Sequence, residues 1–203
     1  MLNDLSGQKR LHFQAKPQAI GKVPMEILRA SDSILDLGCG NGWLTAYIPD
    51  KRKYTGLTNS KPEADNLKNW GYKVIICDLL EDKFILGDSK FDCVFASHII
   101  EHFEQKDLIR IMQKIHKALK PGGWVILAAP TDYNPFFWAE WSHVRPYNHG
   151  SLPGLISEMG FNNVGWTYPQ MDFFSPKYQS LLRFPLTLFK PLLYKEIFAW
   201  GQN

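Results

Sequence analysis

Five apolar runs alternate with helical patterns along the first 130 residues, and this alternation constrains the fold more than any other feature. The runs are rich in β-branched residues and apolar nearly throughout, which is typical of strands covered on both faces. They lie at residues 33–38, 53–58, 73–78, 91–97 and 124–130. Strands that alternate with helices predict an α/β fold built on a parallel, doubly wound sheet.

The helical patterns between these runs carry their own start and stop signals. Ser60 and Glu63 have the spacing of a capping box, and Gly71 supplies a stop. An apolar stripe at helical spacing comes next and ends at "KPGG"; its members are Leu108, Ile111, Met112, Ile115 and Leu119. A third helix is expected from Ser151 to Gly160, and two more strand candidates follow at 162–168 and 195–200.

Composition limits the class of protein. A chain of 203 residues with 45% hydrophobic and 21% charged residues indicates one soluble globular domain. The net charge of +3 is mild and spread out, so no nucleic-acid partner is expected. Three cysteines without a C-x-x-C pair indicate free thiols in a reducing compartment. The N-terminus lacks the apolar core of a signal peptide, so a cytoplasmic location is predicted.

Three glycines within five residues follow the first strand, in "ILDLGCGNGWLT" (34–45). Glycine permits a positive φ and removes the Cβ that would hold a ligand away from the backbone. In such a sheet, ligands bind beyond the carboxyl ends of the strands, where a helix N-terminus favours negative charge. The loop is therefore predicted to cradle a small, polar, anionic group. The dinucleotide-binding pattern G-x-G-x-x-G is not matched, because Trp43 stands where its third glycine is required. The P-loop pattern is not matched either, because no Gly-Lys-Ser/Thr follows the glycines.

This stretch resembles the first motif of class I S-adenosylmethionine-dependent methyltransferases. The segments "YTGLTNS", "CDLLED", "FDCVFASHIIEHF" and "LKPGGWVILAAP" resemble the next motifs in order, and 143–161 resembles the acceptor side of small-molecule members. The resemblance implies a Rossmann-like sheet of seven strands, mostly parallel with an antiparallel last strand. It implies one domain over 1–203, with N-terminal cap helices in 1–30 and an apolar, basic insertion at 169–194. The cofactor would be S-adenosyl-L-methionine and the product S-adenosyl-L-homocysteine.

The resemblance also implies roles for individual residues. The methionine part of the cofactor would be surrounded by Asp36, Gly38, Cys39, Gly40 and Gly42, with Ser97 nearby. Asp78 and the Leu79 N–H would meet the adenine. The family usually ends its second strand with an acidic residue that holds the ribose, but Thr58 and Asn59 stand there. Their bonds would lack charge assistance, unless Glu63 reaches in.

The acceptor side offers several polar candidates. Methyl transfer from a sulfonium is an in-line displacement that depends mainly on positioning, and a base is needed only for a poor nucleophile such as a hydroxyl. We select His143 as the base from a group that also includes His98, His102, His149, Asp132 and Tyr147. Tyr133, Arg145 and Tyr147 are the predicted substrate contacts.

The run His98-Ile-Ile-Glu101-His102 has the spacing of a metal site on one helix face. Ubiquinone-pathway O-methyltransferases carry a similar Glu-x-x-Glu-His that binds a divalent metal, but only Glu101 and His102 match it. A structural pair after the strand is the alternative, and the inverted zinc-peptidase pattern does not fit a run that follows a strand. We therefore expect no metal at this run. If a metal does bind, His98, Glu101 and His102 are the candidate ligands.

Two segments near the C-terminus stand out. "YNPFFWAEW" (133–141) carries five aromatic residues, which fits either a lid over the acceptor or a helix packed on the core. The stretch 181–194 combines a broad apolar face with cationic residues. Peripheral contact with a membrane or lipid acceptor, packing on the domain and a homodimer contact all remain open for it.

The predicted function is S-adenosylmethionine-dependent methylation of a small-molecule acceptor, or of one linked to lipid or saccharide, with oxygen as the preferred atom. A non-catalytic cofactor-binding module, a nicotinamide-dependent oxidoreductase and a metal-dependent hydrolase are the alternatives. The sequence leaves monomer and homodimer open.

Overall fold

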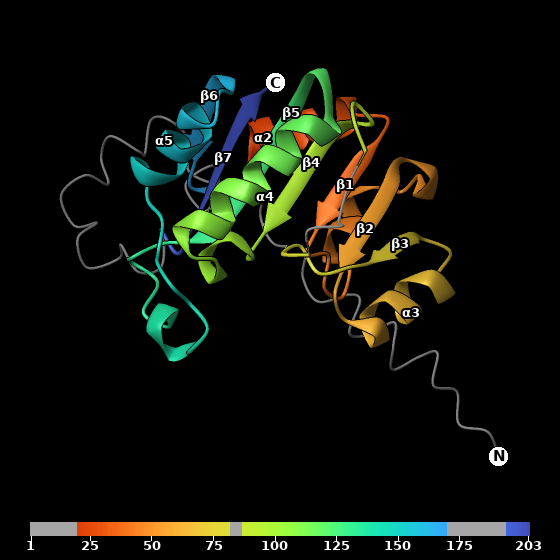
Figure 1. Ribbon diagram of the computed structural model, residues 1–203, viewed down its shortest axis with the longest axis horizontal. Coiled ribbons are helices and arrows are strands. Elements are labelled where there is room, and N and C mark those ends of the chain that lie inside the picture. Colours follow the sequence, from red (N-terminus) through yellow and green to blue (C-terminus); the bar gives the residue numbers. More distant parts are fainter. Residues whose placement is uncertain (1–19, 82–86, 170–193) are drawn as a thin grey trace.

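The central sheet has seven strands in the order β3-β2-β1-β4-β5-β7-β6 (Figure 1). The structure is a computed structural model that describes residues 20–81, 87–169 and 194–203. The strands are β1 (Ile34–Leu37), β2 (Tyr54–Thr58), β3 (Lys73–Ile76), β4 (Phe91–Ser97), β5 (Leu119–Pro130), β6 (Asn162–Thr167) and β7 (Glu196–Gln202). All seven overlap predicted strand segments, but β5 begins at Leu119, which the predicted helical stripe includes, because α4 ends at Ala118.

Strands β1 to β5 run parallel, and β7 lies antiparallel between β5 and β6. This confirms the predicted mixed sheet with an antiparallel last strand. Strand β1 is flanked by β2 on one side and β4 on the other, so the strand order reverses there. Ligands of doubly wound sheets bind at such a switch point, outside the carboxyl ends of the strands.

Helices cover both faces of the sheet. Figure 1 shows α4 (Gln105–Ala118) in front of the sheet and α2 (Lys22–Ala30) behind it. Helix α5 (Ser151–Glu158) shares the core of α4, whereas α3 (Lys61–Asn69) shares that of α2. Side chains of β1 contribute to the hydrophobic cores on both faces of the sheet, because successive side chains of a strand point to opposite faces. Leu35 and Leu37 belong to the core under α4, and Ile34 belongs to the core under α2.

Four short 3-10 helices lie in the described loops between strands and helices. They are η1 (Trp43–Tyr47), η2 (Lys51–Lys53), η3 (Ile100–His102) and η4 (Phe137–Ala139). The helix expected to open directly from the glycine loop is η1, only five residues long. The anion-binding helix terminus predicted there is therefore weaker than that of a full α-helix, since the dipole grows with aligned peptide units.

The predicted capping box does not form. Ser60 is the N-cap of α3, but its side chain makes no capping hydrogen bond. The carboxylate of Glu63 instead accepts a hydrogen bond from the hydroxyl of Thr58. The predicted stop is confirmed, because Gly71 has a φ of 83° directly after the helix.

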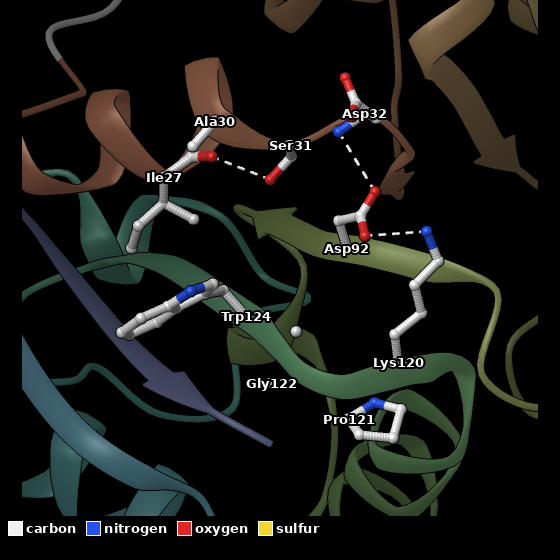
Figure 2. Close-up of a pocket in the computed structure, with 10 residues that line it drawn as sticks. Ile27, Ala30, Ser31, Asp32, Asp92, Lys120, Pro121, Gly122 and Trp124 are labelled. Carbon is white, nitrogen blue, oxygen red and sulfur yellow. Dashed lines mark hydrogen bonds and ion pairs between the residues drawn. The ribbon is translucent and has the colours of Figure 1, made fainter.

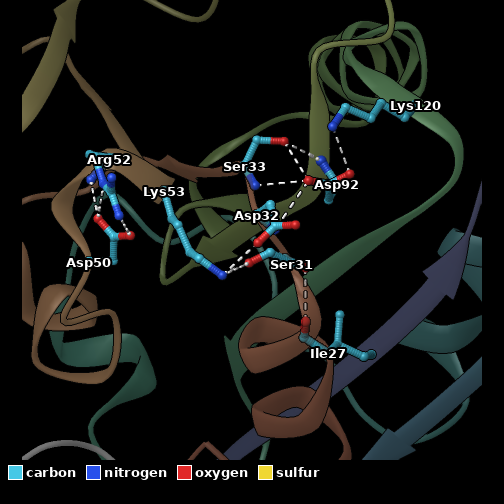
Figure 3. A network of polar contacts seen from close by, with 9 residues as sticks. All are labelled: Ile27, Ser31, Asp32, Ser33, Asp50, Arg52, Lys53, Asp92 and Lys120. Atoms are coloured by element: carbon cyan, nitrogen blue, oxygen red, sulfur yellow. Dashed lines mark hydrogen bonds and ion pairs between the residues drawn. The ribbon is translucent and has the colours of Figure 1, made fainter.

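The amino ends of the strands are held together by charged side chains. A cavity of about 260 Å³ lies here beside α2, and Asp92 and Lys120 lie among its lining residues (Figure 2). Asp92 accepts hydrogen bonds from the Ser33 N–H at 2.8 Å, the Ser33 hydroxyl at 2.7 Å and the Lys120 ammonium at 2.8 Å (Figure 3). Burial by itself raises the pKa of Asp92, but these bonds outweigh it and lower the pKa. The network therefore ties β4 to the chain before β1 and to the start of β5.

Some predictions concern segments outside the described residues. Only α2 represents the expected cap helices in 1–30, since the description begins at residue 20, and the insertion at 169–194 falls almost entirely within 170–193. The predicted membrane contact of 181–194 lies there too. Across the described ranges, no helix combines the length and the apolar character required to span a bilayer.

Candidate active site

A cavity of about 480 Å³ opens at the carboxyl ends of β1, β2 and β3, next to the switch point. Its volume falls within the range of small-molecule sites, about 300–1,000 Å³. It is lined by Gly38, Gly40, Leu57, Thr58, Asn59, Glu63, Cys77, Asp78, Leu79, Leu80, Ile99, His102 and Phe103. Six of the predicted cofactor residues are in this set: Gly38, Gly40, Thr58, Asn59, Asp78 and Leu79.

The three loop glycines have positive φ values of 72°, 49° and 75° at Gly38, Gly40 and Gly42. A Cβ on Gly38 would lie 2.3 Å from the side chain of Ile99, and one on Gly42 would lie 2.3 Å from Leu67. A Cβ on Gly40 would meet nothing within 4 Å. Internal packing therefore requires two of the glycines, whereas Gly40 leaves open space beside its backbone in the cavity wall.

Four predicted cofactor residues do not line this cavity: Asp36, Cys39, Gly42 and Ser97. Cys39 is buried, and its sulfur lies 2.9 Å from where a Cβ on Gly56 would be. Ser97 is buried with no hydrogen-bond partner for its hydroxyl among the described residues. The side chains of Asp36 and Cys39 thus face the interior between the sheet and α2.

Asp36 is nearly inaccessible to solvent and accepts a hydrogen bond of 2.7 Å from the Tyr54 hydroxyl. Burial raises the pKa of Asp36 to about 7, although the Tyr54 bond opposes this. Burial together with the nearby Asp36 raises the pKa of the Cys39 thiol to about 12. Cys39 is therefore a neutral thiol at physiological pH, not a nucleophile, and the hydrogen bond of Asp36 joins β1 to Tyr54 on β2.

A carboxylate from α3 stands beside the end of β2. The Thr58 hydroxyl donates to Glu63 Oε2 at 3.0 Å and accepts from the Ser60 N–H at 3.1 Å. Both Thr58 and Glu63 line the cavity. The acidic group that the second strand itself lacks is thus supplied five residues later, from the first turn of the next helix.

The predicted adenine end is a tight turn after β3. Oδ1 of Asp78 accepts from the Leu80 N–H at 2.9 Å, so the aspartate also stabilises this turn. The Lys114 ammonium donates to the carbonyls of Leu79 and Glu81, both at 3.0 Å, and so anchors the turn to α4. The turn after β3 is therefore stabilised both by its own Asp78 and by Lys114 on α4.

A second polar group gathers after β4. Glu101 is 0% exposed, with His98 Nδ1 at 3.5 Å and His143 Nε2 at 4.0 Å from its Oε1. His98 Nε2 also lies 3.1 Å from Glu196. Burial alone disfavours the charged form of His98, but the two neighbouring carboxylates outweigh it and raise the pKa of His98 to about 10. His98 is thus a half-buried cation shared by two carboxylates.

The structure changes the predicted metal-ligand set. Glu101, His102 and His143 have ligand atoms that all lie within 4.8 Å of one another, and His98 is not part of this group. The reason is tertiary: the Val144 N–H donates to the Glu101 carbonyl at 2.8 Å, which brings His143 beside η3. His102, not the predicted base His143, lines the cavity of about 480 Å³.

The predicted substrate contacts separate into two places. Arg145 and Tyr147 line another cavity of about 590 Å³, between α4 and α5. Tyr133 instead packs against Tyr194, with 5.8 Å between ring centroids. In the aromatic segment only Phe137 is buried, whereas Phe136, Trp138 and Trp141 are 70%, 71% and 92% exposed. The alternative of a helix packed on the core is therefore wrong for most of this segment.

Sequence reasoning missed the apolar part of the cavity wall. Leu57, Ile99 and Phe103 line it, and so do Cys77 and Leu80. Their residue types carry no chemical signal, because apolar residues at strand ends are ordinary core candidates. The sequence could have indicated them only through their place within or beside the segments that resemble the family motifs.

Comparison with known proteins agrees with this geometry. Residues 10–164 match the model of a family described as a methyltransferase domain. The chain belongs to this family. Because three-quarters of the chain is covered and the fold is Rossmann-like, the predicted resemblance to class I S-adenosylmethionine-dependent methyltransferases is confirmed at the level of family and fold.

Individual relatives of this chain are distant. An uncharacterized methyltransferase of Synechocystis is 29% identical over 142 residues, which cover 68% of this chain and 61% of the relative. The (S)-coclaurine N-methyltransferase of Papaver somniferum is 30% identical over 106 residues, covering 47% and 29%. The chain thus spans less than two thirds of either relative. A solved S-adenosylmethionine-dependent methyltransferase of Archaeoglobus fulgidus has the same fold, with a TM-score of 0.69 at 16% identity over 88% and 89% of the two chains.

Proposed function

We propose that this protein transfers the methyl group of S-adenosylmethionine to a hydroxyl oxygen of a small acceptor, either free or linked to a lipid or saccharide. The cavity beside the glycine loop carries this proposal. Gly40 leaves open space at its wall, and Glu63 places a carboxylate at the same wall. Open backbone on one side and an acidic group on the other suit a nucleoside with an amino-acid tail.

In this proposal the cofactor lies across the ends of β1, β2 and β3. Gly38 and Gly40 lie along its methionine part, Glu63 accepts hydrogen bonds from the ribose hydroxyls, and Asp78 accepts one from the adenine amino group. Thr58 supports the ribose contact because its hydroxyl is hydrogen-bonded to Glu63. Ile99 and Phe103 contribute apolar contacts.

The chemistry requires alignment and one proton acceptor. The acceptor oxygen attacks the methyl carbon, the carbon–sulfur bond breaks, and the sulfonium becomes the neutral thioether of S-adenosylhomocysteine. Well-oriented reactants contribute up to roughly 7–11 kcal/mol by positioning alone. A hydroxyl must also lose its proton, which a neutral histidine can accept.

The paired histidines support oxygen as the acceptor atom. Nδ1 of His143 lies 2.8 Å from the Phe137 carbonyl, and Nδ1 of His102 lies 3.3 Å from the Ser142 carbonyl. A carbonyl only accepts hydrogen bonds, so each Nδ1 carries the proton and each Nε2 keeps a free lone pair. His102 is our first choice as proton acceptor because it lines the cavity, with His143 behind it.

Two measurements test this function. Calorimetric titration of the full chain with S-adenosylhomocysteine should give saturable 1:1 binding, whereas NADH should give none. Release of S-adenosylhomocysteine from S-adenosylmethionine should then rise with phenols, sugar alcohols or lipid-linked hydroxyls in an acceptor panel. Binding without turnover on any acceptor would instead support the non-catalytic module.

An amine acceptor is the second candidate. It is favoured by the similarity to the coclaurine enzyme, which is named as an N-methyltransferase, and a buried carboxylate such as Glu101 suits a cationic amine. The same panel should therefore contain secondary and tertiary amines. Turnover restricted to amines would replace the hydroxyl proposal.

A further inference from the structure

Glu101 is a buried carboxylate without hydrogen-bond partners. It is 0% exposed, and neither of its oxygens finds a donor among the described residues. An uncompensated buried carboxylate is costly, so such groups are paired or bind a metal. The closest printed contact of its Oε1 is His98 Nδ1, at 3.5 Å, and the other ring nitrogen of His98 lies 3.1 Å from Glu196. Two carboxylates therefore flank a single imidazole.

Two histidines converge on this carboxylate. His143 Nε2 lies 4.0 Å from Glu101 Oε1, and the His102 and His143 ring centroids are 4.8 Å apart. Two ligand atoms with bonds of about 2.0–2.2 Å to one ion lie about 3.3–3.6 Å apart at a tetrahedral angle, so these side chains would move closer together when an ion binds. All three ligand atoms lie within 4.8 Å of one another.

Both imidazoles are oriented by contacts to their other nitrogen. The Nδ1–H of His143 donates to the Phe137 carbonyl, and that of His102 donates toward the carbonyl and hydroxyl of Ser142. Metal-binding histidines have this outer contact almost always, because it fixes the tautomer and turns the free nitrogen toward the ion. The Nδ1 contacts therefore leave Nε2 of each histidine available to a ligand.

We propose that Glu101, His102 and His143 bind one divalent transition-metal cation, with His98 as a neighbour rather than a ligand. His98 is excluded because its ring nitrogens are not part of the group of ligand atoms, and its Nε2 lies 3.1 Å from Glu196. Two imidazoles and one carboxylate suit Zn²⁺, Fe²⁺, Co²⁺ or Mn²⁺ better than Mg²⁺ or Ca²⁺, which prefer oxygen ligands throughout. Solvent or substrate would complete the coordination.

The site borders the proposed cofactor cavity through His102. An acceptor hydroxyl bound to the cation would lose its proton more easily, and His102 and His143 would then be ligands instead of bases. This consequence rests on the proposed methyl transfer. The metal site itself does not, because it can be measured without cofactor or acceptor.

The test is metal binding to the chelator-treated full chain. Calorimetry with Zn²⁺ and Co²⁺, and electron paramagnetic resonance with Mn²⁺, should show one ion per chain and a metal-dependent rise in melting temperature. Glu101→Gln and His143→Gln should each weaken metal binding at least about tenfold. Changes to the residues that orient metal ligands already cost about tenfold to a hundredfold in affinity. The matched control His149→Gln, which changes an exposed histidine outside the cluster, should bind like the unmodified protein.

Two results would overturn the proposal. One is the absence of saturable binding of all three ions, and the other is binding that Glu101→Gln and His143→Gln leave unchanged. If Glu101→Gln fails to fold, the His143→Gln variant decides, because His143 lies in a loop and not in the sheet. Metal binding without S-adenosylhomocysteine binding would refute the proposed function while supporting the metal site.

Discussion

The hydroxyl of Thr58 donates a hydrogen bond of 3.0 Å to the carboxylate of Glu63, which joins the end of β2 to the first turn of α3. The acidic group at the proposed ribose position therefore comes from a helix and not from the strand. This arrangement keeps a carboxylate at the cavity wall despite the uncharged end of the strand.

Replacement of Glu63 by glutamine tests that arrangement. Loss of the charge should weaken S-adenosylhomocysteine binding by about 1–2 kcal/mol, or roughly five- to thirtyfold in Kd, because hydrogen bonds to charged groups are stronger than neutral ones. Calorimetric titration measures the change. Asp65→Asn is the matched control, since Asp65 lies on the same helix and pairs with Lys61 at the surface. Equal affinity of the Glu63 and Asp65 variants would refute the ribose role.

Gly40 should tolerate a methyl group for folding but not for binding. Gly40→Ala is expected to cost about 1–2 kcal/mol of stability, because an alanine must adopt a φ near 49°. Binding of S-adenosylhomocysteine should fall at least about tenfold, since the new Cβ enters open space at the cavity wall. Urea denaturation and calorimetry measure the two effects.

Gly71→Ala is the control for that change. Its φ is 83°, and a Cβ there would meet only Lys51, at 3.6 Å or more. It should therefore carry a similar backbone strain without any loss of binding. Gly42→Ala should instead unfold the protein more readily than either, because its Cβ would collide with Leu67. Normal ligand affinity in Gly40→Ala would show that the open space is not a ligand position.

Asp78→Asn separates two roles of one carboxylate. The amide oxygen can still accept from the Leu80 N–H and keep the turn, but the amide nitrogen would oppose the adenine amino group. We expect S-adenosylhomocysteine binding to weaken by about 1–3 kcal/mol with little change in melting temperature. Asp78→Ala should lose both affinity and some stability. An Asp78→Asn variant that binds normally would reduce Asp78 to a turn residue.

Asp36 should make stability depend on pH. Its pKa rises from 3.8 to about 7 on folding, so the folded state holds a proton more tightly than the unfolded state. The destabilising effect of the buried charge is therefore absent below about pH 4, grows as the pH rises, and is complete above about pH 7. Asp36→Asn, which keeps an acceptor for Tyr54, should gain stability relative to the unmodified protein over this window, by up to about 4 kcal/mol.

Urea denaturation of both proteins at pH 5 and pH 8 measures this gain. Tyr54→Phe removes the hydrogen bond that favours the carboxylate, so the unmodified Asp36 in that background should titrate at a higher pH. Parallel stability profiles of the Asp36→Asn variant and the unmodified protein would contradict the assignment.

The chain's own sequence determined where the strands lie and where the glycine loop lies. Runs such as Ile34–Leu37 are apolar at nearly every residue because helices cover both faces of the sheet, and this local pattern is readable without coordinates. The order of the motifs then indicated a glycine loop at the carboxyl end of the first strand.

Only the tertiary structure decided which side chains share a site. His143 joins Glu101 and His102 across about forty residues because the loop after η4 bonds to η3, whereas His98, adjacent in sequence, turns to Glu196 on the last strand. In the same way Gly38 and Gly42 serve packing, whereas Gly40 leaves open space in the cavity wall. Spacing along a chain fixes local geometry, but contacts between distant segments depend on how the whole sheet packs, and no single stretch encodes them.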